Sequence, residues 1–115
     1  MTATPAAVAA AYFEAWRTRD FARLRTLLDP TVTFDGPLGT ADNADSFLHG
    51  IEGLSEVMTD IVVLHSWADG PDVATWFELH TRLSEPCQTV NWSHVEDGRI
   101  TRVLVTFDPR GLIGG

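Results

Sequence analysis

Two side chains in this chain are candidates for moving a proton. Asp35 follows the strand-like stretch 31–34 and precedes a loop rich in glycine and proline. It is either a turn residue that accepts backbone N–H bonds or a base at the mouth of a pocket. His80 lies near the end of a second strand-like stretch. If it faces inward it could serve as an acid or base near neutral pH, and a surface position is the alternative.

Two further side chains could donate hydrogen bonds to a ligand. Tyr12 lies on the apolar face of the first predicted helix, where a core tyrosine with a satisfied hydroxyl is the alternative. Asn91 lies within a predicted strand, where asparagine is uncommon, so a buried Asn91 would need partners and would suit a pocket. One register of the strands sets His80 directly across from Asn91 on the same face, and a slip of one residue separates them.

Composition and charge exclude several other kinds of chemistry. The chain has 16 acidic and 8 basic residues, a net charge of −8, and no lysine. This balance repels phosphate backbones, so no nucleic-acid partner is expected. Cys87 is the single cysteine and the histidines form no ligand pair, so neither a disulfide nor a metal site is predicted. The chain lacks phosphate- and dinucleotide-binding motifs, so no cofactor is expected.

The sequence also lacks the signals of membrane insertion and export. No apolar run approaches the roughly 20 residues that a membrane-spanning helix needs. The first residues have no basic group before their apolar part, which a secretory signal would require. We therefore expect a cytoplasmic protein that makes no contact with a membrane.

The elements that must position these residues follow from the hydrophobic periodicity. Helices are predicted over 5–16 and 21–28, and a third over 43–58 that Gly50 and Gly53 divide into two pieces. The later stretches, 60–68, 72–83, 88–95 and 99–107, alternate with a period of two and predict strands. Helices followed by strands predict a single α+β domain over 1–115, with a core of about 5–107 and a tail over 108–115.

Several predicted strands are apolar on both faces. The strand over 72–83 carries Phe77 and Leu79 on one face and Trp76 on the other. In the last strand, Leu104 lies opposite Val103. Helices can cover one face of the sheet, and a bare apolar opposite face is typical of an interface. We therefore expect a homodimer formed through the outer face.

With these elements in order, the chain resembles a known superfamily. The segments "VAAAYFEAWRTRDFARLRTLLDPTVTFDGPLG" and "NWSHVEDGRITRVLVTFDP" are similar to the nuclear transport factor 2-like superfamily, in particular its SnoaL-like and ketosteroid isomerase branches. The resemblance covers about residues 5–107. It implies a cone-shaped, curved antiparallel sheet wrapped by the N-terminal helices, with a deep apolar pocket inside. The superfamily hosts both enzymes and binding modules.

The resemblance also implies roles for individual residues. In ketosteroid isomerase an Asp acts as the base, and a Tyr and a protonated Asp donate hydrogen bonds to the carbonyl oxygen of the substrate. By position, Asp35 matches the base and Tyr12 matches the tyrosine, while Asn91 stands where the second acid is expected. An amide can still donate a hydrogen bond to a carbonyl oxygen. Trp16, Phe34 and Phe107 are the expected contacts of a hydrophobic ligand.

Two functions are therefore expected of this chain. The first is a cofactor-free isomerase or cyclase, in which Asp35 or His80 moves a proton beside a carbonyl that Tyr12 and Asn91 polarise. The second is a module that binds a hydrophobic small molecule without catalysis. The position of the base distinguishes them, because only the enzyme needs Asp35 or His80 near Tyr12 and Asn91.

Overall fold

The computed structural model describes residues 3–111 and shows helices packed on a curved sheet. The helices are α1 (Pro5–Arg17), α2 (Phe21–Thr26), α3 (Ala44–Ser55) and the 3₁₀ turn η1 (Pro109–Gly111). The strands are β1 (Leu28–Gly36), β2 (Gly39–Ala41), β3 (Met58–Asp69), β4 (Asp72–Thr81), β5 (Cys87–Glu96) and β6 (Arg99–Thr106). None of the helices within 3–111 has the length and apolar character needed to cross a bilayer.

Local signals explain where the two long helices begin. The Thr4 side chain accepts a hydrogen bond from the Ala7 backbone N–H at 3.2 Å, and Pro5 occupies the first helical position of α1. The Asn43 side chain accepts from the Ser46 N–H at 2.7 Å and starts α3 in the same way. Each cap satisfies a backbone donor that has no partner within the helix.

The third helix is continuous, and the expected division at its glycines is wrong. α3 runs without interruption from Ala44 to Ser55 through both Gly50 and Gly53. Each glycine costs about 1 kcal/mol relative to alanine in a helix interior. The burial of Phe47 and Ile51 on the inner side of α3 offsets that cost.

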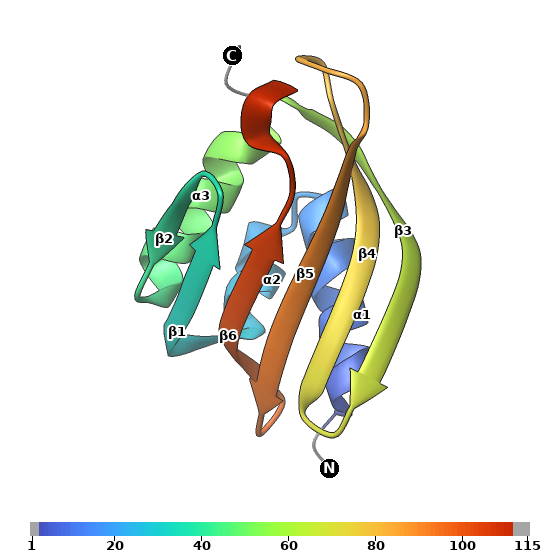
Figure 1. The fold of residues 1–115 in the computed structure, drawn as a ribbon. Coiled ribbons are helices and arrows are strands. Elements are labelled where there is room, and N and C mark those ends of the chain that lie inside the picture. The colour runs from blue at the N-terminus through green and yellow to red at the C-terminus, as the bar shows by residue number, and fades with distance from the viewer. Residues whose placement is uncertain (1–2, 112–115) are drawn as a thin grey trace.

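The strands form one open sheet in the order β2-β1-β6-β5-β4-β3 (Figure 1). The pairs from β3 to β6 are antiparallel, as the alternating pattern predicted. β1 pairs with β6 in parallel, and Leu28 lies beside Ile100. The α+β class with a curved sheet is therefore confirmed, and the parallel pair is a difference from the expected all-antiparallel sheet. The long connection through α3 and the strands β3 to β5 allows β1 and β6 to run in the same direction.

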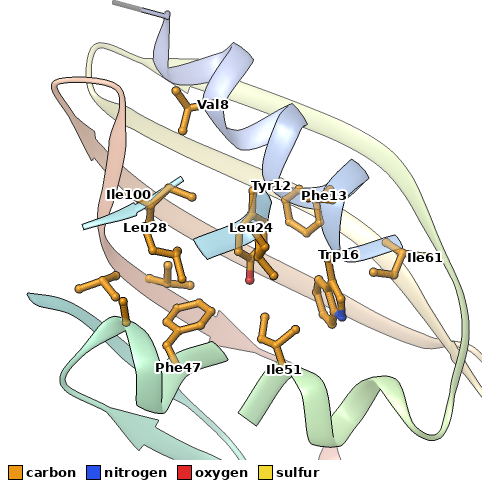
Figure 2. Close-up of a cluster of buried hydrophobic side chains, with 14 of the residues drawn as sticks. Val8, Tyr12, Phe13, Trp16, Leu24, Leu28, Phe47, Ile51, Ile61 and Ile100 are labelled. Carbon is orange, nitrogen blue, oxygen red and sulfur yellow. The ribbon is translucent and has the colours of Figure 1, made fainter. Parts of the chain in front are cut away.

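The helices cover one face of the sheet, which we call the inner face. Figure 2 shows Tyr12, Phe13 and Trp16 of α1 in the same cluster as Phe47 and Ile51 of α3. The strands contribute buried side chains from alternate positions, as predicted, including Val73, Thr75, Phe77 and Leu79 of β4. The aromatic rings of α1 and β4 pack together, with the centroids of Phe13 and Phe77 4.9 Å apart.

The opposite, outer face carries exposed apolar side chains. Trp67 is 56% exposed, and Trp76, Val90 and Leu104 are between 36% and 40% exposed. The His65 ring stacks between the rings of Trp67 and Trp76, with centroid distances of 5.6 and 5.5 Å. The two-faced character that the sequence indicated is thus present, with the helices on one side only.

Candidate functional site

A cavity of about 290 Å³ lies between the inner face of the sheet and the helices α1 and α3. Its walls come from α1, α3, the β1–β2 hairpin and the inner sides of β4, β5 and β6. Most of the wall is apolar. The volume is at the lower end of the range for small-molecule pockets, and so fits a compact ligand.

The buried end of the cavity holds Tyr12 and Asn91, as the sequence predicted. Both side chains line the cavity and both are only 1% exposed. Tyr12 reaches it from α1, because Tyr12 and Trp16 are one helical turn apart on the same face. Asn91 reaches it from β5, where alternation places Thr89, Asn91 and Ser93 on the inner face. The helix and the strand thus bring two polar groups to one place.

A neighbouring hydroxyl orients the Asn91 amide. Ser93 Oγ donates a hydrogen bond to Asn91 Oδ1 at 2.8 Å, and both residues are buried. This bond occupies the amide oxygen and leaves the amide nitrogen of Asn91 as the donor end of the side chain at the cavity wall. Its N–H groups are therefore available to a ligand in the cavity.

The Tyr12 hydroxyl is also available as a donor. Figure 2 shows its oxygen pointing from α1 toward the α3 side of the core. Tyr12 is part of the cavity wall, so its hydroxyl can reach a ligand there. Burial raises the pKa of Tyr12 well above its ordinary value. The phenol therefore stays protonated and can donate a hydrogen bond over the whole physiological range.

The three residues expected to contact a hydrophobic ligand all line this cavity. Trp16 comes from α1, Phe34 from β1, and Phe107 from the segment after β6. The Phe34 ring packs against Phe47 of α3 with the centroids 5.0 Å apart. The Trp16 indole nitrogen is buried without a hydrogen-bond partner in the described part of the chain, which is unusual for a buried polar group.

Asp35 lies outside the cavity. It is exposed, and it pairs with Thr40 of β2 and Leu104 of β6 at positions where β1 alternates regularly. The inward position next to it is taken by Phe34, which lines the cavity. Successive side chains of a strand point to opposite faces, so Asp35 is directed to the outer face. The interpretation of Asp35 as a base at the mouth of the pocket does not agree with this geometry.

His80 also lies outside the cavity, which agrees with the surface alternative, and the register that would set it across from Asn91 does not form. Thr75, not His80, is the partner of Asn91 across β4 and β5. His80 instead shares the outer face with Glu78, and His80 Nε2 lies 3.1 Å from Glu78 Oε1. The inward position between them belongs to Leu79, which lines the cavity. The connection over 82–86 is long enough to shift the pairing, and the sequence does not determine that shift.

The cavity consequently has donors but no ionised group. Its lining residues within 3–111 include no aspartate, glutamate, histidine or arginine, and Tyr12 is protonated. Such a site can hold and polarise a carbonyl or ether oxygen, since phenol and amide donors in an apolar wall bind an acceptor strongly. It offers no side chain with an ordinary pKa near neutrality to take a proton.

Sequence reasoning missed the residues that shape the mouth of the cavity. The β1–β2 hairpin contributes Leu38, and α3 contributes Ser46, Gly50 and Leu54. The sequence signal for Gly50 is a glycine within an otherwise helical pattern, which often has a packing or functional reason. Ser93 was missed as well, and the N-x-S spacing on a strand places its side chain on the same face as Asn91.

Comparison with known proteins agrees with this architecture. The model of the SnoaL-like domain family matches residues 9–103. No curated protein sequence gives a significant match. Among solved structures, the chain is similar to a nuclear transport factor 2-like protein from Cytophaga hutchinsonii, with 24% identity and a TM-score of 0.88 over 98% of this chain and 97% of the other.

Two further similar structures belong to proteins with suggested activities. One is a candidate ketosteroid isomerase from Kribbella flavida, with 23% identity and a TM-score of 0.81 over 94% of this chain and 82% of that one. The other is a candidate polyketide cyclase from Sinorhizobium meliloti, with 18% identity and a TM-score of 0.80 over 85% and 92%. At these identities the likeness shows the fold alone. From the match of the family model, the chain belongs to the SnoaL-like domain family, and its fold is like that of the nuclear transport factor 2-like structure from Cytophaga hutchinsonii.

Proposed function

We propose that this protein binds a compact, uncharged, largely apolar molecule that carries a carbonyl oxygen, and that it does so without acid–base catalysis. The observation that carries the proposal is the pairing of Tyr12 and Asn91 at the buried end of the cavity, with no carboxylate or imidazole in its lining. Two neutral donors suit a neutral acceptor. An anion would have no cation to compensate its burial there.

The cavity wall defines the rest of the ligand. Phe34, Phe77 and Phe107 offer aromatic surfaces, which favour a flat ligand of one or two rings. The carbonyl end would lie against Tyr12 and Asn91, and the apolar rings would lie between α3 and the sheet. The choice of ligand class rests on this cavity wall and on the two donors at its buried end.

A pair of matched probes tests the proposal. Titration calorimetry compares 2-acetylnaphthalene with 2-isopropylnaphthalene, which has nearly the same shape and no acceptor. We expect the ketone to bind about five- to tenfold more tightly, the scale of about 1 kcal/mol for one buried hydrogen bond. Tyr12→Phe and Asn91→Leu should each reduce that preference. Equal binding of the two probes, or no binding of either, would contradict the proposal.

The same probe distinguishes binding from catalysis. An acid–base enzyme would speed the exchange of the acetyl protons of 2-acetylnaphthalene for deuterium in D₂O, which proton NMR follows directly. We expect no acceleration above buffer. Asp35→Asn and His80→Gln serve as matched controls, since both side chains lie on the outer face and should leave affinity unchanged. Acceleration that either variant abolishes would favour the isomerase or cyclase function instead.

A further inference from the structure

Gly50 is a glycine that neither the backbone nor the packing of α3 requires. Its φ is not positive, unlike that of Gly39, Gly70 and Gly98, so its conformation is open to any residue. A Cβ atom placed on Gly50 would meet no atom within 4 Å. Alanine would favour the helix more than glycine does, so Gly50 weakens α3 without a reason in its backbone conformation or its packing.

Gly53 shares these properties and differs in one respect. It lies in the same helix, has open space around its Cβ position, and also lacks a positive φ. Gly50 lines the cavity, whereas Gly53 does not. The two glycines therefore form a natural comparison, in which only Gly50 can affect the contents of the cavity.

The residues that line the cavity are buried at one end and exposed to solvent at the other. Tyr12 and Asn91 at the polar end are almost fully buried. Gly50 of α3 and Leu38 of the β1–β2 hairpin are exposed, and Leu38 reaches 51%. Figure 1 shows α3 and the β1–β2 hairpin side by side at the end of the sheet formed by β2. The cavity thus opens toward solvent between this helix and this hairpin.

We infer that a bound ligand extends out of the cavity over Gly50, and that the missing side chain there sets the length of ligand that the protein accepts. The inference rests on the proposed function. With its carbonyl held by Tyr12 and Asn91, the far end of a longer ligand would pass the α3 backbone at Gly50. A side chain at that position would occupy the ligand's path, whereas one at Gly53 would project into solvent.

Two ketones of different length test the inference. The short probe is 2-acetylnaphthalene, and the long probe is 6-propionyl-2-(dimethylamino)naphthalene, whose fluorescence reports binding directly. We expect Gly50→Leu to bind the long probe about tenfold more weakly than the unaltered protein does. The leucine side chain would occupy the space through which the far end of the long probe passes. Affinity for the short probe should change less than about twofold, and Gly53→Leu should bind both probes normally.

The possible results separate the inference from the proposed function. If the unaltered protein binds neither ketone, both fail. If it binds them and Gly50→Leu either retains the long probe or loses both probes equally, only the inference is overturned. Equal loss in Gly53→Leu also overturns it. Should Gly50→Leu not fold, Gly50→Ala and Gly53→Ala replace the pair, with a weaker loss of the long probe expected in Gly50→Ala alone.

Discussion

At the scale of single residues, the candidate site depends on two hydrogen-bond donors at the buried end of the cavity. Tyr12 and Asn91 sit in an apolar wall, where an unpaired polar group is costly. A ligand that accepts hydrogen bonds from both side chains would satisfy them at the buried end of the cavity.

The ionisation of Tyr12 can be observed without interference, because Tyr12 is the single tyrosine of the chain. Burial raises its pKa, so tyrosinate absorbance at 295 nm should not develop near the ordinary pKa of about 10 while the protein is folded. In 8 M urea the same group should titrate near that ordinary value.

The sign of the effect on stability follows from the raised pKa. The folded state holds the Tyr12 proton more tightly than the unfolded state, so stability is complete below about pH 10 and falls as the pH rises above it. Tyr12→Phe should remove this alkaline loss from the melting curves. An ordinary titration in the folded protein would show that Tyr12 is open to solvent.

The sequence predicted which residues could form a site better than it predicted which face of the sheet their side chains point to. Tyr12 could be placed because helical spacing sets it on the same face as Trp16. Asp35 could not, because the glycines and proline that follow it permit either a bulge or continued pairing. The structure shows continued pairing with β2 and β6, and this alone directs the carboxylate away from the cavity.

At the scale of elements, Arg19 links the turn after α1 to the start of the meander, the antiparallel strands β3 to β6. It has φ 58°, in the left-handed region, and follows the C-cap residue Thr18 of α1. Its Nη2 donates to the carbonyl oxygens of Ser55 at 3.2 Å and Met58 at 2.6 Å. The turn after α1 is thereby tied to the end of α3 and the beginning of β3.

Removing this link should lower stability. We expect Arg19→Ala to reduce the free energy of unfolding by about 1–2 kcal/mol, because two carbonyls lose a charged donor at a partly exposed site. Arg23→Ala is the matched control. Its guanidinium makes no hydrogen bond within the described residues, and the change should stay within about 0.5 kcal/mol. Urea denaturation measures both, and equal losses would argue against the role of Arg19.

The outer face carries a chain of hydrogen bonds across β4 and β5. Trp76 Nε1 donates to Gln88 Oε1 at 2.7 Å, and Gln88 Nε2 donates to Glu78 Oε2 at 2.9 Å. Hydrogen bonds from Gln88 and then from His80 lower the pKa of Glu78. The chain fixes β4 against β5 on the side away from the cavity.

This lowered pKa predicts a dependence of stability on acid. The contribution of Glu78 is present above its unfolded pKa of about 4.3 and is lost as the pH falls through the lower folded value. Glu78→Gln should therefore lower the melting temperature at pH 7 and have little effect near pH 2. Glu85→Gln, in the loop after β4, should behave like the unaltered protein at both pH values. If the melting temperatures of Glu78→Gln and the unaltered protein differed by the same amount at both pH values, the lowered pKa of Glu78 would not be the cause of the difference.

At the scale of the whole molecule, the helices cover the inner face and leave apolar side chains of the outer face exposed. An exposed apolar face of this kind is typical of an interface. We propose that the partner on this face is a second copy of the chain. The exposed residues Trp67, Trp76, Val90 and Leu104 lie on the meander's outer side, where a two-fold pairing of the same surface would bury them all. The stacked rings of His65, Trp67 and Trp76 would lie in the same contact.

Light scattering tests the dimer. The unaltered protein should have about twice the 12.6 kDa chain mass at micromolar concentration. Trp76→Glu should shift it toward the monomer, because a carboxylate would be buried in the contact. Leu83→Glu alters a similarly exposed apolar residue outside the strands and should leave the mass unchanged. A monomeric unaltered protein would rule the dimer out.

The parallel pairing of β1 with β6 matters for how the protein is made. Leu28 emerges from the ribosome long before its neighbour Ile100 in the parallel pair. Until then, the meander from β3 to β5 can form by local hairpins, and α1 has only part of the surface that it will cover. Phe107 completes the cavity wall later still. The cavity is therefore incomplete until these last elements have been synthesised, and a ligand bound in it could stabilise only the assembled fold.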